Sequence, residues 1–173
     1  MLISKLDTRE LLEMCVCGVL PVYDNYGDNI SRILLWEAEP IYQRYRTDTM
    51  IKRIAETFCK DISLIKKRAS HLSGQRTCNA LPIAHNIVLI PFKTRIPICK
   101  DDGATGYVLL SAIDDVSENK SEGVSIQLMN GHTIITSEAL KTCKHRIAMA
   151  KHISDIMLEE ERQTLKKYVF ASE

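Results

Sequence analysis

The spacing of apolar residues changes repeatedly along this chain, and the order of these changes constrains the fold more than any other feature. Apolar residues follow strand-type patterns before residue 40 and again from 81 to 136, whereas helical periods of three and four residues occupy 48–73 and the region after 137. Strands and helices therefore come in separate blocks and do not alternate as in a parallel sheet. The sequence predicts an α+β fold with antiparallel hairpins at both ends, a central basic helical pair and a long C-terminal helix.

Turn-forming residues mark the two hairpins. The first hairpin joins 14–22 to 30–36 through the polar segment 23–29, which contains only turn formers. The second covers 124–136, where Asn130-Gly131 separates two apolar runs. This dipeptide predicts a type I′ turn because both residues tolerate positive φ angles.

The region between the hairpins contributes further strands. Pro82 and Pro91 border an apolar run whose residues 86–90 are expected to form a buried strand. Residues 106–113 are expected to form another strand, and the polar stretch 114–123 is expected to be a mobile surface loop.

Capping residues delimit three helices. Asp48 is placed to cap the first helix, Asp61 and Gly74 begin and end the second, and Ser137 is placed to cap the third. The apolar stripe of the third helix ends near residue 160. Residues 1–160 are therefore predicted to form a single domain, followed by a charged C-terminal tail at 161–173.

Composition places the chain among compact globular proteins. Hydrophobic residues make up 45% and charged residues 26% of its 173 residues, close to the usual shares of about 45–50% and about 25%. The longest apolar run, 87–90, is far shorter than the roughly 20 residues that span a bilayer, so no membrane partner is expected. The N-terminus lacks a secretory pattern and the six cysteines are scattered, so we expect reduced thiols and a cytoplasmic location.

Charge is strongly segregated along the sequence. Residues 1–40 and 101–173 each carry a net charge of −4, whereas 41–100 carry twelve Lys and Arg against three Asp and Glu, or +9. Two interpretations remain open at this point. Either the cationic block meets an anionic partner such as nucleic acid, or it neutralises the acidic flanks within the fold.

Metal and cofactor sites are not predicted. Cys15 and Cys17 have a spacing that zinc sites rarely use. His145 and His152 share one side of a helix, but lysines beside them oppose a bound cation. The better interpretation of that side is a solvated helix face.

Catalysis rests on no positive motif either. The sequence contains no Gly-rich phosphate loop, no HExxH and no GxSxG. Cys99 would become a candidate nucleophile only if the fold brought His71 or His85 beside it. We therefore expect a protein that is not an enzyme.

Several short segments occur in an order that is typical of one family. They are Val19-Leu20-Pro21, Glu39-Pro40-Ile41, Lys66-Lys67-Arg68, Leu81-Pro82-Ile83, Ile87-Val88-Leu89-Ile90-Pro91 with Thr94, Pro97, Cys99, the Asn130-Gly131 hairpin and the helix carrying Arg146. In order and spacing these segments resemble the competence transcription factor family (ComK), bacterial DNA-binding activators. The resemblance covers roughly residues 15 to 158.

The resemblance implies a transcriptional activator of competence at the bacterial nucleoid. Such a protein recognises paired A/T-rich boxes in double-stranded DNA, largely through the minor groove, as a homo-oligomer: a dimer or a dimer of dimers. The family also implies an adaptor that delivers the protein to a protease, although the aromatic tail motif for that adaptor is missing here.

The cations of the central block are the expected DNA contacts. Arg68 or Arg95 is expected to enter the minor groove, because an A-tract has a narrow groove with enhanced negative potential. The remaining expected nucleic-acid contacts are Arg53, Lys60, Lys66, Lys67, Arg76 and Lys93. The alternative is a non-enzymatic protein-interaction regulator whose basic face docks an acidic protein partner.

Overall fold

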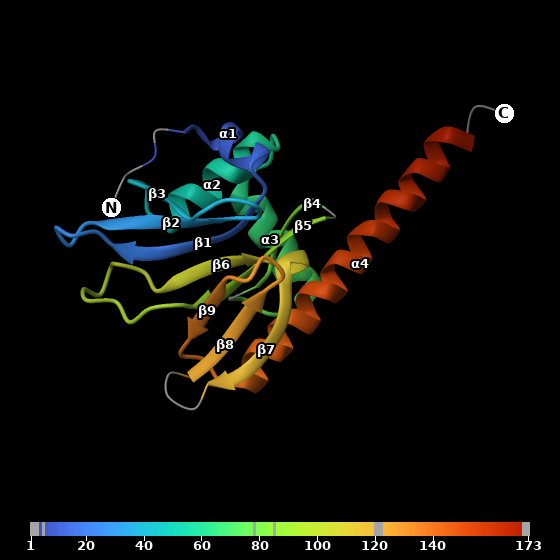
Figure 1. Cartoon of the computed structure of the whole chain (residues 1–173). Coiled ribbons are helices and arrows are strands. Elements are labelled where there is room, and N and C mark those ends of the chain that lie inside the picture. The colour runs from blue at the N-terminus through green and yellow to red at the C-terminus, as the bar shows by residue number, and fades with distance from the viewer. Residues whose placement is uncertain (1–3, 5, 78, 85, 120–122, 171–173) are drawn as a thin grey trace.

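The computed structural model describes residues 4, 6–77, 79–84, 86–119 and 123–170. The predicted α+β class is confirmed (Figure 1). The described helices are α1 (Thr8–Glu13), α2 (Thr47–Thr57), α3 (Ile62–Ser73) and α4 (Leu140–Phe170), with a short 3₁₀ helix at Leu110–Ala112. The described strands are β1 (Val16–Tyr23), β2 (Asn29–Leu35), β3 (Ile41–Gln43), β4 (Leu81–Ala84), β5 (Ile87–Lys93), β6 (Thr105–Leu109), β7 (Ile113–Asn119), β8 (Gly123–Leu128) and β9 (Thr133–Thr136).

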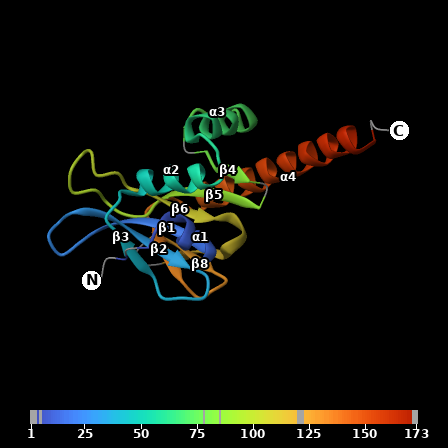
Figure 2. The ribbon, with the colours of Figure 1, turned by 90° about the horizontal axis from the view of Figure 1, so that it is seen from above.

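The strands form two antiparallel sheets. The larger sheet has the order β3-β2-β1-β6-β5-β4, and the smaller has the order β7-β8-β9. Helices α1, α2 and α3 lie on one side of the larger sheet, and the smaller sheet and the first part of α4 lie on the other (Figures 1 and 2). The larger sheet is thus the middle layer of the molecule.

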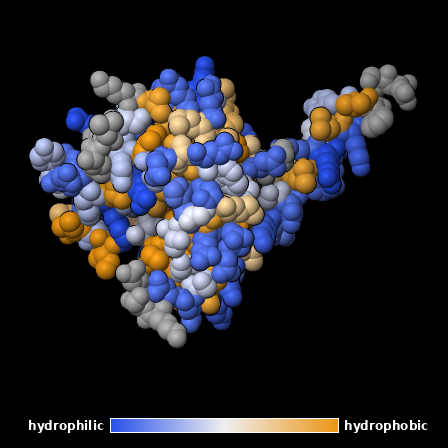
Figure 3. Space-filling model, viewed as in Figure 1, coloured by the Kyte–Doolittle hydropathy of each residue, from blue (hydrophilic) through white to orange (hydrophobic). Residues whose placement is uncertain are grey.

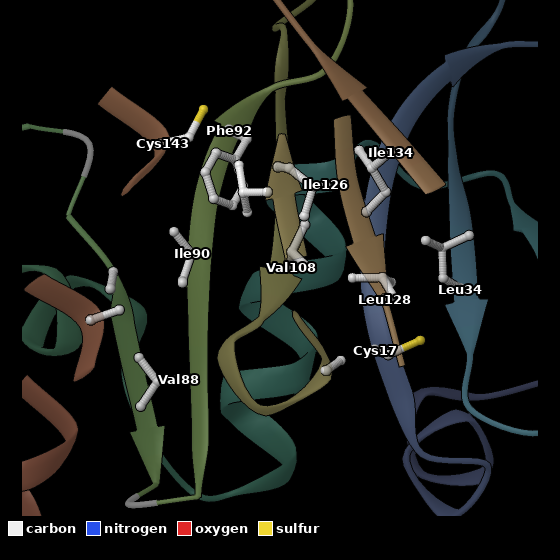
Figure 4. Close-up of a cluster of buried hydrophobic side chains, with 14 of the residues drawn as sticks. Cys17, Leu34, Val88, Ile90, Phe92, Val108, Ile126, Leu128, Ile134 and Cys143 are labelled. Carbon is white, nitrogen blue, oxygen red and sulfur yellow. The ribbon is translucent and has the colours of Figure 1, made fainter. Parts of the chain in front are cut away.

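Burial on both faces explains the near-continuous apolar runs of the central strands. Val19 and Ile33 belong to the cluster of buried residues under α1, α2 and α3. Their chain neighbours Leu20 and Leu34 belong to the second cluster, between the sheets and α4. Figure 4 shows side chains of the second cluster, among them Phe92, directed between the layers.

The predicted buried strand at 86–90 is confirmed as β5, which covers Ile87–Lys93. The earlier part of the same apolar run forms a further strand, β4, which pairs with β5. Strand β6 ends at Leu109, and the 3₁₀ helix then redirects the chain into β7. The predicted loop 114–123 is wrong, because 113–119 form β7, which pairs with β8. Its polar residues face solvent on an edge strand, where charges discourage pairing with other chains.

The second hairpin is confirmed, but its turn is not type I′. The Gly131 N–H donates to the Leu128 carbonyl and Gly131 has a φ of +86°, whereas Asn130 does not have a positive φ. This is the three-residue loop in which a left-handed glycine follows a type I turn. The Asn130 side-chain amide donates to the Leu35 carbonyl at 2.8 Å, which fastens the hairpin to the larger sheet.

Two of the predicted helix starts also need correction. Arg46, and not Asp48, occupies the N-cap of α2, and Asp48 lies in its first turn. The Ser137 N–H donates to the Lys93 carbonyl at 3.2 Å, and α4 begins at Leu140. Helix α4 also continues past residue 160 to Phe170.

The end of α4 projects from the body of the molecule (Figure 1). Leu165, Tyr168 and Val169 are 63%, 80% and 60% exposed there. Apolar patches are visible on this projecting part (Figure 3). None of the described helices combines the length and apolar character that a membrane span requires.

Candidate nucleic-acid interface

Helix α2 packs against the larger sheet and positions the cationic helix α3 that follows it. Its residues Met50, Ile51, Ile54 and Ala55 are almost completely buried in the cluster that covers the larger sheet. Four residues, 58–61, then connect α2 to α3. The chain reverses there through a left-handed conformation at the non-glycine residue Cys59, with a φ of 54°.

Local signals in the sequence fix both ends of α3 as predicted. The Asp61 carboxylate accepts hydrogen bonds from the backbone N–H groups of Ser63 and Leu64 at 2.7 and 3.1 Å. These bonds, with that from Leu64 first, lower the pKa of Asp61. At the other end Gly74 adopts the left-handed conformation, with a φ of 67°. Ile65 and Ala69 face the core and Ile62 and Leu72 are half-buried against it, which leaves the opposite side of the helix exposed to solvent.

The exposed side chains of this helix and its two flanks form what we name the α3 surface. It consists of Lys60, Ser63, Leu64, Lys66, Lys67, Arg68, His71 and Arg76. No Asp or Glu occurs in the sequence from residue 62 to residue 100. Figure 2 shows α3 as the outermost element on its side of the larger sheet. The structure therefore brings together five of the eight predicted contacts: Lys60, Lys66, Lys67, Arg68 and Arg76.

Two of these cations also border a hollow beside α3. Lys66 and Arg76 line it together with Ser70 of α3 and with Pro91 and Tyr107 of the larger sheet, and its volume is about 300 Å³. Cationic groups thus extend from the outer face of α3 to its sheet side.

Arg68 is the one member of this surface that the described residues pair with a carboxylate. Its guanidinium donates to Glu160 of α4, and the two side chains are 46% and 50% exposed. Glu160 neutralises the charge on this side of α3. An exposed pair of this kind contributes little to stability, about 0–1 kcal/mol.

Arg95 lies in a different environment from the α3 surface. Its guanidinium donates to Asn29 Oδ1 at 2.8 Å and to the backbone carbonyls of Asp102 and Gly103, and it stacks over the Tyr23 ring at 4.2 Å. Burial lowers the pKa of Arg95. These contacts hold the 96–103 loop against the first hairpin, which gives Arg95 a structural role.

The same loop is fastened a second time through Asp102. Its carboxylate accepts hydrogen bonds from the Tyr23 hydroxyl at 2.6 Å and from the Cys99 N–H at 2.9 Å. These bonds, with that from Tyr23 first, lower the pKa of Asp102. Asp102, a residue of the acidic C-terminal flank, therefore helps to fix the conformation of the 96–103 loop.

The two remaining predicted contacts lie apart from the α3 surface. Arg53 is half-buried, and its guanidinium lies 3.7 Å from the centre of the Tyr45 ring. Lys93 is exposed at the end of β5, and its backbone N–H donates to Glu138 at 3.1 Å.

The sequence reasoning missed three residues of this region: Leu64, His71 and Glu160. Leu64 falls outside the inward stripe of Ile65 and Ala69, so the helical period alone could have placed it on the outer face. The contact of Glu160 with Arg68 joins residues 92 positions apart and has no local signal.

The described residues contain no group of three His, Cys, Asp or Glu side chains suited to a metal ion. Cys15 is exposed whereas Cys17 is buried, and burial raises the pKa of the Cys17 thiol. Cys99 is exposed; of the two histidines considered as its partner, His71 is an exposed residue of α3 and His85 lies outside the described residues.

Comparison with known proteins adds no assignment, because no protein-family model, curated protein or solved structure matches the chain.

Proposed function

We propose that the chain is a transcriptional regulator that binds double-stranded DNA through the α3 surface, with a preference for A/T-rich sequence. The observation that carries this proposal is the cluster of Lys60, Lys66, Lys67 and Arg76 on the outermost helix and its flanks. Among the ion pairs of the described residues, none involves these four side chains.

Phosphate groups are the anions that such a surface fits. Each cation that contacts a phosphate releases condensed counterions, which makes duplex binding dependent on salt. Contacts of this kind position a protein on the duplex without reading its sequence. The preference for A/T-rich DNA, and the activator role, come from the resemblance to the competence transcription factor family.

A charge-removal experiment tests the proposal. The double substitution Lys66→Ala with Lys67→Ala should weaken binding to every duplex and flatten the dependence of log K on log salt by about one to two units. The matched control is Lys141→Ala with Lys144→Ala, which removes the same charge from two exposed residues of α4. Gel-shift titrations over a range of salt concentrations give both slopes.

The outcomes separate DNA binding from its rival. An unchanged salt slope in the α3 variant, or an equal change in the α4 control, contradicts the proposal. Wild-type protein should retard A/T-rich duplex more than G/C-rich duplex at physiological salt. Failure to retard either duplex would favour the alternative, in which the basic face docks an acidic protein.

A further inference from the structure

Helices α2 and α3 have the layout of a helix-turn-helix unit. Eleven residues of α2 are followed by four connecting residues and by twelve residues of α3. Helix-turn-helix units join their two helices by a turn of three or four residues that often contains glycine. Cys59 here adopts the left-handed conformation for which glycine is the usual residue.

The packing of the pair fits the same layout. Ile54 and Ala55 of α2 and Ile65 of α3 share one buried cluster, and Ala55 is 0% exposed. The Lys60 N–H donates to the Ala55 carbonyl at 3.0 Å, which ties the turn to the end of α2. Helix α3 runs across the direction of α2 (Figure 1) and stands outermost (Figure 2). The first helix therefore rests on the sheet and presents the second.

The outer face of α3 has a defined composition. Ser63, Leu64, Lys67 and His71 follow one another at spacings that place them on one side of a helix, and all four are exposed. Lys66 and Arg68 lie on its two edges, one beside the hollow and the other beside α4. Lys67 lies nearest the middle of this face, and Leu64, 67% exposed, lies on the side toward Arg68, one helical turn before it.

The dimensions of this face match the wider groove of DNA. A helix with its side chains is about 10–12 Å across. The major groove is about 12 Å wide and admits a helix, whereas the minor groove is about 6 Å wide. Arg95 and Arg68, the two residues expected to enter a minor groove, are held by the 96–103 loop and by Glu160.

We infer that α3 enters the major groove with this outer face toward the bases, Leu64 against thymine C5-methyl groups and Lys66 toward the phosphates on one flank. This inference rests on the proposed function and replaces the minor-groove mode that the family resemblance implies. It also supplies a reason for A/T preference, since the thymine methyl is the apolar group that the major groove displays.

Replacing thymine by uracil tests the inference. The two bases differ only in the C5-methyl group, so an A/T-rich duplex made with uracil keeps its minor-groove edges and loses its major-groove methyls. Wild-type protein should bind the uracil duplex more weakly, by about fourfold for each methyl that it contacts. Leu64→Ala should bind the thymine duplex more weakly and should no longer distinguish the two duplexes. This substitution is at an exposed helical position where alanine is favourable, so the fold is retained.

The matched control is Leu165→Ala, at a leucine of α4 that is 63% exposed. It should behave like the wild type toward both duplexes. Equal binding of thymine and uracil duplexes by the wild type overturns the inference while leaving DNA binding intact. Discrimination that persists in Leu64→Ala overturns it as well, because the methyl effect then arises from DNA shape or from another residue. Absence of binding to either duplex overturns the proposed function itself.

Discussion

The largely buried ion pair between Arg146 and Glu138 should make a large contribution to the stability of the fold. Arg146 donates to both carboxylate oxygens of Glu138, at 2.6 and 2.9 Å, and also to the Pro91 carbonyl. The same carboxylate accepts the Lys93 N–H at 3.1 Å. The side chains of Arg146 and Glu138 are only 14% and 9% exposed, respectively. Because these bonds join the start of α4 to the end of β5, the pair holds the helix on the larger sheet.

Substitution of Glu138 by leucine removes three hydrogen bonds at once. Two of them come from the Arg146 guanidinium, and hydrogen bonds to charged groups contribute about 1.5–3 kcal/mol each. Small residual exposure lets water replace part of this, so we expect a loss of about 3–4 kcal/mol, within the usual cost of breaking a buried pair. Removal of both charges, in Glu138→Leu with Arg146→Met, should cost less than Glu138→Leu alone.

Urea unfolding followed by circular dichroism measures these differences. With a slope of about 2 kcal/mol per molar urea, Glu138→Leu should lower the midpoint by about 1.5–2 M. The double variant should recover a large part of this shift. The reasoning is refuted if the single substitution lowers the midpoint by less than about 0.5 M, or if the double variant loses the sum of the two single losses.

Two further predictions concern the α3 surface. Glu160→Gln frees the Arg68 guanidinium and should raise duplex affinity and steepen the salt slope by about one unit, whereas the control Glu159→Gln should not; equal slopes in gel-shift titrations would contradict this. Asp61 has a lowered pKa in the fold, so its ionised form stabilises α3 above its unfolded pKa of about 3.9, and this contribution is lost as the pH falls through the folded value. Below about pH 5, the midpoint temperature of thermal unfolding should therefore fall more steeply with decreasing pH for the wild type than for Asp61→Asn. Parallel plots of midpoint temperature against pH for the two proteins would contradict this.

Local patterns were sufficient for α3 and its surface. Asp61 and Gly74 cap the helix through bonds that span three residues or fewer or through a single backbone angle, so the sequence carries these signals directly. The spacing of Ile65 and Ala69 fixes which side is buried, and the positions of Lys66 and Lys67 on the outside follow from it.

Contacts between distant parts of the chain explain what the sequence could not predict. Strand β7 is polar, and only its pairing with β8 makes it a strand. Ser137 is a residue type typical of helix caps, but α4 begins only at Leu140, and Ser137 instead joins the end of β5 through a hydrogen bond from its N–H to the Lys93 carbonyl. Arg95 resembles any other cation of the block, although Asn29 and Tyr23, more than 60 positions earlier, hold its guanidinium.

Part of the cationic block is neutralised within the fold. Arg46 pairs with Asp102, and Arg68 pairs with Glu160. Both carboxylates belong to the acidic C-terminal flank, so these two cations are neutralised within the fold. Helix α4 contacts α3 at two points. Just after the C-terminal end of α3, Gln75 Nε2 lies 3.0 Å from Nε2 of His145, and in the middle of α3, Arg68 contacts Glu160.

The acidic run 159–161 of α4 therefore flanks only one side of α3. A phosphate backbone would be repelled from that side and attracted toward Lys60, Lys66 and Lys67, whose charges no described carboxylate pairs. For a duplex bound as proposed, this asymmetry predicts an orientation: one strand should run along the Lys66 edge of α3, and the strand nearest α4 should gain contacts only when Glu160 loses its charge.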